Sequence, residues 1–202
     1  VHEDVSSSLL QQILRTSIPI HHYGKMNPET WKRKWDLYRR LGEKKAVEQK
    51  DYYAYFELGR QYLAGKTDAG KPSLDQAKAM FEKSLGLNNS FWLGWFNLGS
   101  IHLIQDNLAS AQDCLERARQ LNPQAPQIYL NLGVAYVRQK KYQTAVDLFC
   151  RGLQLNPQRA DLYKNLGLCY IEMGQERDAI LVLKKAVELN PEYAKIIQFE
   201  KK

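Results

Sequence analysis

The stretch Gln127–Pro157, QIYLNLGVAYVRQKKYQTAVDLFCRGLQLNP, carries a pattern that recurs on both sides of it at a fixed interval. An aromatic residue is followed by Leu-Gly, a second aromatic, an alanine, a large apolar residue and a proline: Tyr129, Leu132-Gly133, Tyr136, Ala145, Phe149 and Pro157. Thirty-four residues later the pattern falls on Tyr163, Leu166-Gly167, Tyr170, Ala179, Leu183 and Pro191. Thirty-four residues earlier it falls on Trp95, Leu98-Gly99, His102, Ala111, Leu115 and Pro123. A fourth copy with a six-residue insertion has Tyr55, Leu58-Gly59, Tyr62, Ala77 and Phe81.

Each copy of the pattern predicts two helices. Apolar residues recur at three- and four-residue steps in both halves, so each half has one apolar helical face. Gly133 and Ala145 are small where the two helices must approach closely, because a bulky side chain there would hold them apart. A single helix hairpin cannot bury its apolar face alone, so each copy must pack on the next.

This pattern resembles the tetratricopeptide repeat, whose period is 34 residues. Each copy also carries Leu-Asn at its end: Leu87-Asn88, Leu121-Asn122, Leu155-Asn156 and Leu189-Asn190. The resemblance implies an all-α, right-handed superhelix of four helix hairpins that acts as a protein–protein interaction module. We expect repeats at residues 52–91, 92–125, 126–159 and 160–193, and a helix at 194–202 that caps the last one.

The composition is that of a soluble globular protein, with 44% hydrophobic and 25% charged residues in 202. No apolar run is long enough for a membrane span, and no signal peptide opens the chain. Cys114, Cys150 and Cys169 stand singly in helical patterns, which favours buried, reduced thiols over disulfides or a metal site. These features predict a cytoplasmic location.

A basic segment precedes the repeats. Nine basic and four acidic residues lie between Lys25 and Lys50, and the chain as a whole has a net charge of +7. Asn27 can cap a helix and Pro28 suits its first turn, so residues 25–50 are predicted to form a basic linking helix. A solvated helix face explains such a segment, and attraction to phosphates or an acidic partner is the alternative. No RNA-binding pattern or recognition helix supports nucleic-acid binding.

Residues 1–24 lack the repeat pattern, and Ser17–Tyr23 is predicted to be a short strand. The run VHED, then IHHYG, the basic helix and DYYAYFELGRQYL resemble the junction in bacterial family 2 glycosyltransferases whose catalytic domain is followed by tetratricopeptide repeats. The resemblance makes His2 and Glu3 the positions that match a V-H-E element near the active site, and His21 or His22 the match to an H-x-G element. It implies a parent enzyme that uses a nucleotide sugar and a divalent metal.

No transferase activity is expected from this chain alone, because the donor-binding strands, the metal motif and the catalytic base would lie upstream of Val1. His2 and Glu3 are equally explained as solvated residues at a terminus, and one His-Glu dipeptide is too few ligands for zinc. The repeats themselves offer no paired carboxylates, catalytic triad or metal cluster, so no cofactor is predicted for them. A stand-alone scaffold of repeats is the remaining alternative.

Two further features have ordinary structural explanations. Residues 65–73, GKTDAGKPS, superficially resemble a phosphate-binding loop, but Pro72 follows the lysine and no strand precedes it, so they are predicted to form a lengthened turn. Ser73 would then cap the following helix. His102 takes a tyrosine position of the pattern and is predicted to be a packed core histidine.

The candidate binding residues lie on the first helix of each repeat. Two positions before each helix glycine stands Glu57, Asn97, Asn131 or Asn165. In the tetratricopeptide domain of O-linked N-acetylglucosamine transferases, a similar asparagine ladder holds the backbone of an extended peptide, and an amide can both donate to and accept from peptide groups. Nearby positions would add apolar contact (Tyr53, Phe56, Phe96, Leu130, Val134 and Leu168) or select acidic residues (Arg60, Arg138 and Lys164). The alternative is that these asparagines bond within the scaffold.

Overall fold

The computed structural model describes residues 51–64 and 73–194, together with residues 33, 40–41, 43–44 and 47–48. The seven described residues of the basic segment are helical. The predictions for residues 1–24, including the strand and the candidates His2 and Glu3, lie outside the described residues. So do those for most of the basic segment, for residues 65–72 and for residues 195–202.

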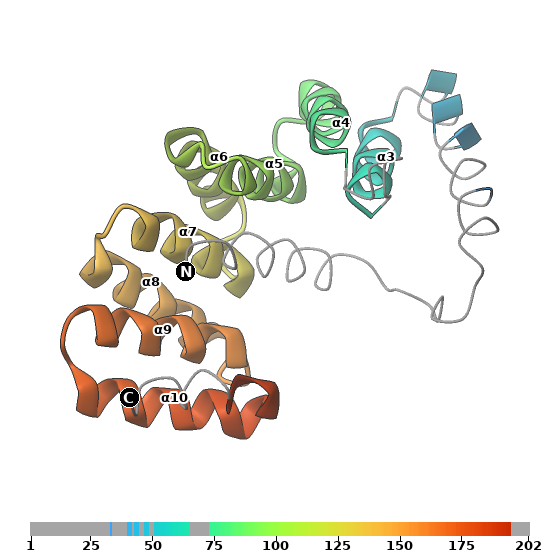
Figure 1. Cartoon of the computed structure of the whole chain (residues 1–202). Coiled ribbons are helices and arrows are strands. Elements are labelled where there is room, and N and C mark those ends of the chain that lie inside the picture. Colours follow the sequence, from blue (N-terminus) through green and yellow to red (C-terminus); the bar gives the residue numbers. More distant parts are fainter. Residues whose placement is uncertain are drawn as a thin grey trace. The chain divides into compact units, whose positions relative to one another are not determined.

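All regular structure in the described residues is helical, and the helices follow one another in pairs (Figure 1). The pairs are α3 (Tyr52–Ala64) with α4 (Leu74–Leu87), α5 (Trp92–Ile104) with α6 (Leu108–Leu121), α7 (Pro126–Arg138) with α8 (Tyr142–Leu155), and α9 (Ala160–Glu172) with α10 (Glu176–Leu189), followed by the short 3₁₀ helix η1 (Pro191–Tyr193). The predicted all-α helix-pair fold is therefore confirmed for these residues. The chain divides into two compact units, the first ending at Asn107 and the second beginning at Leu108.

In the first unit α4 packs against both α3 and α5. Its core is formed by buried side chains from these three helices: Ala54, Phe56, Leu58, Tyr62, Leu63, Ala77, Phe81 and Ile101. His102 is also buried, as predicted, and burial lowers the pKa of its imidazole, as does the charge of Lys78, while Glu82 opposes this. The neutral ring is therefore favoured in the fold.

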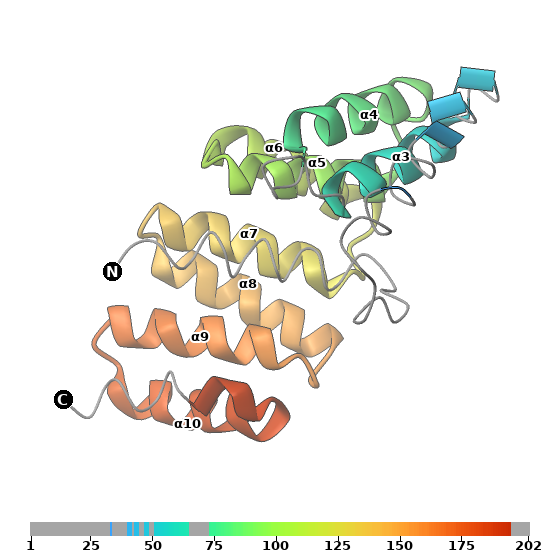
Figure 2. The same cartoon turned by 45° about the vertical axis from the view of Figure 1, so that its right-hand side comes forward.

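In the second unit each helix packs on the next, from α6 through α7, α8 and α9 to α10, and η1 packs on α10. Figure 2 shows α7, α8, α9 and α10 lying one below another in that order. Burying an apolar stripe on both sides of each inner helix is the expected result of a repeated hairpin. Cys114 and Cys169 are buried as predicted, whereas Cys150 is only half-buried.

The Leu-Gly signature of the first helices is explained by close helix packing. A Cβ placed on Gly59 would lie 2.7 Å from the ring of Phe81, and one on Gly167 would lie 2.5 Å from Leu183. In each case the large residue belongs to the second helix of the same pair. A side chain at the glycine would therefore push the two helices apart.

The Leu-Asn signature is explained by the turns between pairs. The side chains of Asn88, Asn122, Asn156 and Asn190 each accept a hydrogen bond from the backbone N–H two residues later, at 3.0–3.2 Å between the heavy atoms. These are Asx turns, in which the side chain replaces a backbone acceptor. Ser73 stands at the N-cap of α4, but its side chain makes no capping hydrogen bond, so that part of the prediction is wrong.

Candidate functional site

The predicted binding residues come from the first helix of each pair. On α7, Leu130, Val134 and Arg138 follow one another at four-residue steps and so share one face of the helix. Gly133, on another face, packs against Phe149 of α8. The predicted positions on α7 therefore lie away from the contact that holds the hairpin together. The candidate binding residues are divided between the two units, and each unit is described by itself.

In the first unit Tyr53 and Phe56 of α3 belong to an aromatic cluster. Their ring centroids lie 5.8 Å apart, and the ring of Phe91 meets Phe56 edge-on at 4.9 Å and Tyr53 at 6.3 Å. Phe56 is buried, but Tyr53 is 48% exposed. Tyr53 is thus the aromatic residue of this group that a partner can reach without any rearrangement.

Arg60 is already engaged within α3. Its Nη1 lies 2.9 Å from Oε1 of Glu57, and its guanidinium carbon lies 5.8 Å from the centre of the Phe56 ring. Its Nε is buried and has no hydrogen-bond acceptor among the described residues. Since Glu57 stands where the other copies have asparagine, the first repeat replaces the predicted amide by an internal ion pair.

Asn97 of α5 is the most deeply buried of the three asparagines, with 2% of its surface exposed. Its Nδ2 donates to the carbonyl oxygen of Leu93, one turn earlier, at 2.8 Å. Its Oδ1 is buried and accepts no hydrogen bond from the described residues. A buried acceptor without a donor is costly, but a ligand can reach this atom only if the face around it opens.

In the second unit the α7 positions are covered. Leu130, Asn131 and Val134 are all buried, so a partner reaches them only if this face opens, while Arg138 is half-buried. The apolar contact expected of Leu130 and Val134 stays a prediction. Phe96 of α5 is buried as well.

The corresponding face of α9 is more open. Leu168 is 36% exposed, and Lys164 and Asn165 are partly exposed. Nδ2 of Asn165 donates to the carbonyl oxygen of Asp161 at 2.7 Å, which repeats the geometry of Asn97 and Leu93. No described residue donates a hydrogen bond to Asn165 Oδ1. The internal bond fixes one end of the amide and leaves the other available.

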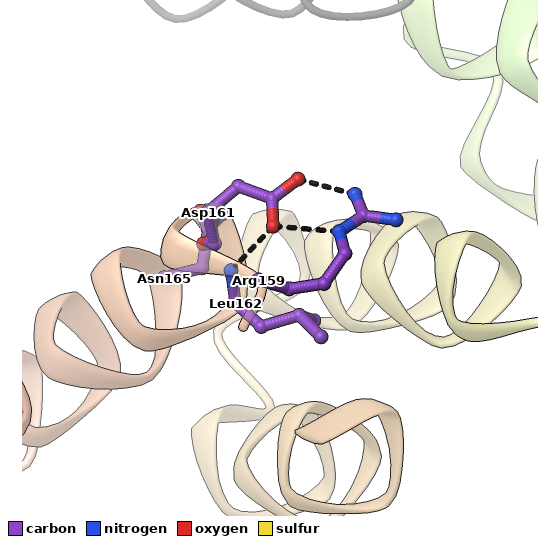
Figure 3. Close-up of polar contacts among 4 residues, drawn as sticks. All are labelled: Arg159, Asp161, Leu162 and Asn165. Atoms are coloured by element: carbon purple, nitrogen blue, oxygen red, sulfur yellow. Dashed lines mark hydrogen bonds and ion pairs between the residues drawn. The ribbon is translucent and has the colours of Figure 1, made fainter. Parts of the chain in front are cut away.

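An ion pair at the start of α9 positions this asparagine (Figure 3). Asp161 Oδ1 accepts from Arg159 Nε at 2.9 Å and from the backbone N–H of Leu162 at 2.9 Å, and its second oxygen contacts Arg159 Nη2. Both side chains are largely buried. Because Asp161 also supplies the carbonyl that holds Asn165, the pair fixes the backbone beneath the amide. Sequence reasoning missed it, and the only signal was an Arg and an Asp two residues apart at a helix start.

Lys164 is a partly buried cation on this face. Burial lowers the pKa of its ammonium group, and the nearby charge of Asp161 partly opposes that effect. Its Nζ lies 5.3 Å from the centre of the Tyr193 ring in η1.

Metal and membrane sites are not seen in the part of the chain that the structure describes. No group of three or more His, Cys, Asp and Glu residues there is arranged to hold a metal ion. None of the described helices is both long enough and apolar enough to span a bilayer.

Comparison with solved structures shows the fold. A crystal structure of MamA is 24% identical, with a TM-score of 0.68, and the match covers 85% of this chain and 99% of that one. MamA from Desulfovibrio magneticus RS-1 is 18% identical with the same TM-score, covering 94% and 95% of the two chains. A chain of the APC/C hetero-tetramer Cut9–Hcn1 is 20% identical with a TM-score of 0.71, and the match covers 86% of this chain and 34% of that one.

Comparison by sequence concerns the C-terminal half. No curated protein sequence matches the chain. Two family models, both described as tetratricopeptide repeat, match residues 105–160 and 136–198. They start well after residue 60, so they lend no support to the glycosyltransferase resemblance. The family models thus identify tetratricopeptide repeats within residues 105–198, and the solved structures share the fold of the chain.

Proposed function

We propose that this chain is a protein–protein interaction module whose first helices bind an extended peptide or protein segment. The observation that carries the proposal is the repeated geometry of Asn97 and Asn165. In both, Nδ2 is held by the carbonyl four residues earlier, while Oδ1 accepts nothing from a described residue. The partly exposed amide of Asn165 can therefore accept a backbone N–H group of a ligand whatever the ligand's side chains, and the buried amide of Asn97 can do so only if its face opens.

The charges on these faces favour acidic residues in the ligand. Lys164 is the strongest candidate, because its ammonium group is partly desolvated and an added carboxylate would stabilise its charged form. Arg60 is less available, since it pairs with Glu57. Tyr53 and Leu168 are exposed enough to contact the ligand's apolar side chains.

The solved structures support the class of partner. In one of them, the chain that shares this fold is part of the APC/C hetero-tetramer Cut9–Hcn1. Tetratricopeptide repeats present helix faces to other proteins and contribute no catalytic residues of their own. Both observations support a protein as the partner.

The test is selection of random 12-residue peptides on the purified chain, followed by titration of enriched peptides against variants. We expect enrichment of Asp and Glu, and loss of about tenfold or more in affinity when Asn97, Asn131 and Asn165 are all changed to alanine, since each bond contributes about 0.5–1.5 kcal/mol. Asn165→Ala alone should account for part of this loss, and Lys164→Gln should weaken acidic peptides more than neutral ones of equal length.

Asn89→Ala is the matched control. Asn89 is exposed, and Trp95 Nε1 bonds its backbone oxygen and not its side chain, so this variant keeps the fold. It should bind as well as the wild type. Unchanged affinity in a folded triple variant would assign the asparagines to the scaffold alone.

The glycosyltransferase hypothesis concerns a parent protein and rests on the sequence resemblance of the first 60 residues. No contact among the described residues bears on it. Finding a catalytic domain with an Asp-x-Asp motif in the reading frame upstream of Val1 would support it, and an unrelated domain there would end it.

A further inference from the structure

Leu181 on α10 breaks the pattern of the repeats. It is 70% exposed, and its neighbour Ile180 is 49% exposed. One and two repeats earlier, the position of Leu181 is occupied by Asp147 and Asp113, both exposed. A carboxylate is the expected residue at a solvated position, whereas a leucine there exposes apolar surface to water. This part of α10 therefore has the character of a contact surface.

Another repeat stacked on α10 would not remove the anomaly. Val146, which corresponds to Ile180, is 6% exposed in α8, against which α9 packs. Asp147 remains exposed in the same helix even though α9 is present. A further helix packed as α9 packs on α8 would thus cover Ile180 and leave Leu181 in water. Leu181 requires a different occupant.

The residues around Leu181 form a stripe with coiled-coil spacing. Arg177, Leu181, Lys184 and Glu188 are all exposed and follow at steps of four, three and four residues. That spacing places them in one stripe along the helix. Ala179, Leu183 and Ala186 are buried on the other side of α10, toward the body of the unit. The stripe is therefore the outward face of the last long helix.

We propose that this stripe binds the same stripe of a second copy of the chain, with the two α10 helices antiparallel. The charge order supports that occupant, because reversing the helix places Arg177 opposite Glu188 at both ends of the contact. Leu181 then lies opposite Lys184, whose aliphatic stem can cover it while the ammonium group stays in water. Arg177 has no ion pair with a described residue. Glu188 bonds Lys185 at 2.9 Å, an exposed and hence weak pair that can accommodate a second cation.

Such an interface is self-complementary, as a two-fold dimer requires. Its apolar part is small, so the dimer is weak. The dimeric fraction should rise with protein concentration and fall on dilution. Analytical ultracentrifugation of the whole chain across a wide concentration range tests this directly. We expect the mass to rise from 23.4 kDa toward twice that value. A mass that stays monomeric at every concentration would overturn the proposal.

Two sets of variants assign the dimer to this stripe. Leu181→Asp introduces the residue that α6 and α8 carry at this position, so the fold tolerates it, and dimerisation should weaken by at least about tenfold. Arg177→Glu and Glu188→Arg should each weaken the dimer, and the double variant should restore it because the two charges are exchanged. Arg151→Glu, the same charge reversal on the exposed side of α8, is the control and should change nothing. A dimer that is indifferent to Leu181→Asp, or a double variant weaker than either single one, would exclude this interface.

Discussion

The hairpin of α7 and α8 and the hairpin of α9 and α10 share one 34-residue pattern and differ on their surfaces. In both, a glycine of the first helix lies against a large apolar residue of the second, Phe149 or Leu183. Yet Leu130, Asn131 and Val134 are buried on α7, while the matching positions on α9 are partly exposed. The interior of a hairpin is thus set by its own repeat. Its surface depends on what lies outside it.

The largest expected difference between the two hairpins concerns their cores. Phe149→Ala should lower the free energy of unfolding by about 3–5 kcal/mol, because α8 is packed between α7 and α9 and cannot close the cavity. Leu183→Ala should cost about 2–3 kcal/mol, because α9 is the one long helix that packs on α10 among the described residues, so α10 can relax. Urea unfolding followed by circular dichroism measures both. Equal losses would mean that the two cores are equally constrained.

The ion pair at the start of α9 has no counterpart on α7, whose first turn begins with Pro126. Asp161→Ala leaves the largely buried Arg159 without its carboxylate and leaves the N–H of Leu162 with only the carbonyl oxygen of Arg159 as acceptor, so we expect a loss of about 1–3 kcal/mol. Asp147→Ala on the exposed side of α8 is the control and should stay within about 0.5 kcal/mol. Raising the salt concentration should shrink the first loss only slightly, since the pair is largely buried. A loss that vanishes in 1 M salt would make it a surface pair.

Much of this hairpin architecture follows from sequence. The recurring Leu-Gly and Leu-Asn pairs predict where helices approach and where they end, because both depend on local geometry. Burial of a helix face cannot be predicted in the same way. The spacing of Leu130 and Val134 shows that they share a face, but it does not show that the face is buried. The ion pair of Arg159 and Asp161 could not be predicted from the sequence either. It forms across a helix start, and its geometry depends on the path of the preceding turn.

The turns within the two hairpins offer a smaller test. Lys140 and Gly174 occupy the same turn position, both with positive φ, at 60° and 72°. Only glycine adopts this conformation without steric cost, so Lys140→Gly should stabilise and Gly174→Ala should destabilise the chain, each by about 1 kcal/mol. A Cβ on Gly174 would meet no atom within 4 Å, so the second effect is conformational and not a clash. Thermal unfolding distinguishes the signs. A stabilising Gly174→Ala would contradict the assigned turn.

The smallest expected effect comes from making α9 resemble α7 at one position. Lys164 stands where α7 has Leu130, so Lys164→Leu exchanges a partly desolvated ammonium group for an apolar side chain. We expect stabilisation of about 0.5 kcal/mol at pH 7, the size typical of a partly exposed position. It should be accompanied by weaker binding of acidic peptides.

The pH dependence separates charge from apolar contact. Since the pKa of Lys164 is lowered in the fold, the unfolded chain holds the proton more tightly, and the wild type gains stability as pH rises from the lowered pKa to the ordinary value of 10.5. The leucine variant lacks that gain. The difference in free energy of unfolding between the leucine variant and the wild type should therefore narrow as pH approaches 10.5. The difference that remains at that pH is the contribution of the leucine's apolar contact. A difference that widens with pH would show that the fold stabilises the charged ammonium group, and the role of Lys164 as a desolvated cation awaiting an acidic partner would have to be abandoned.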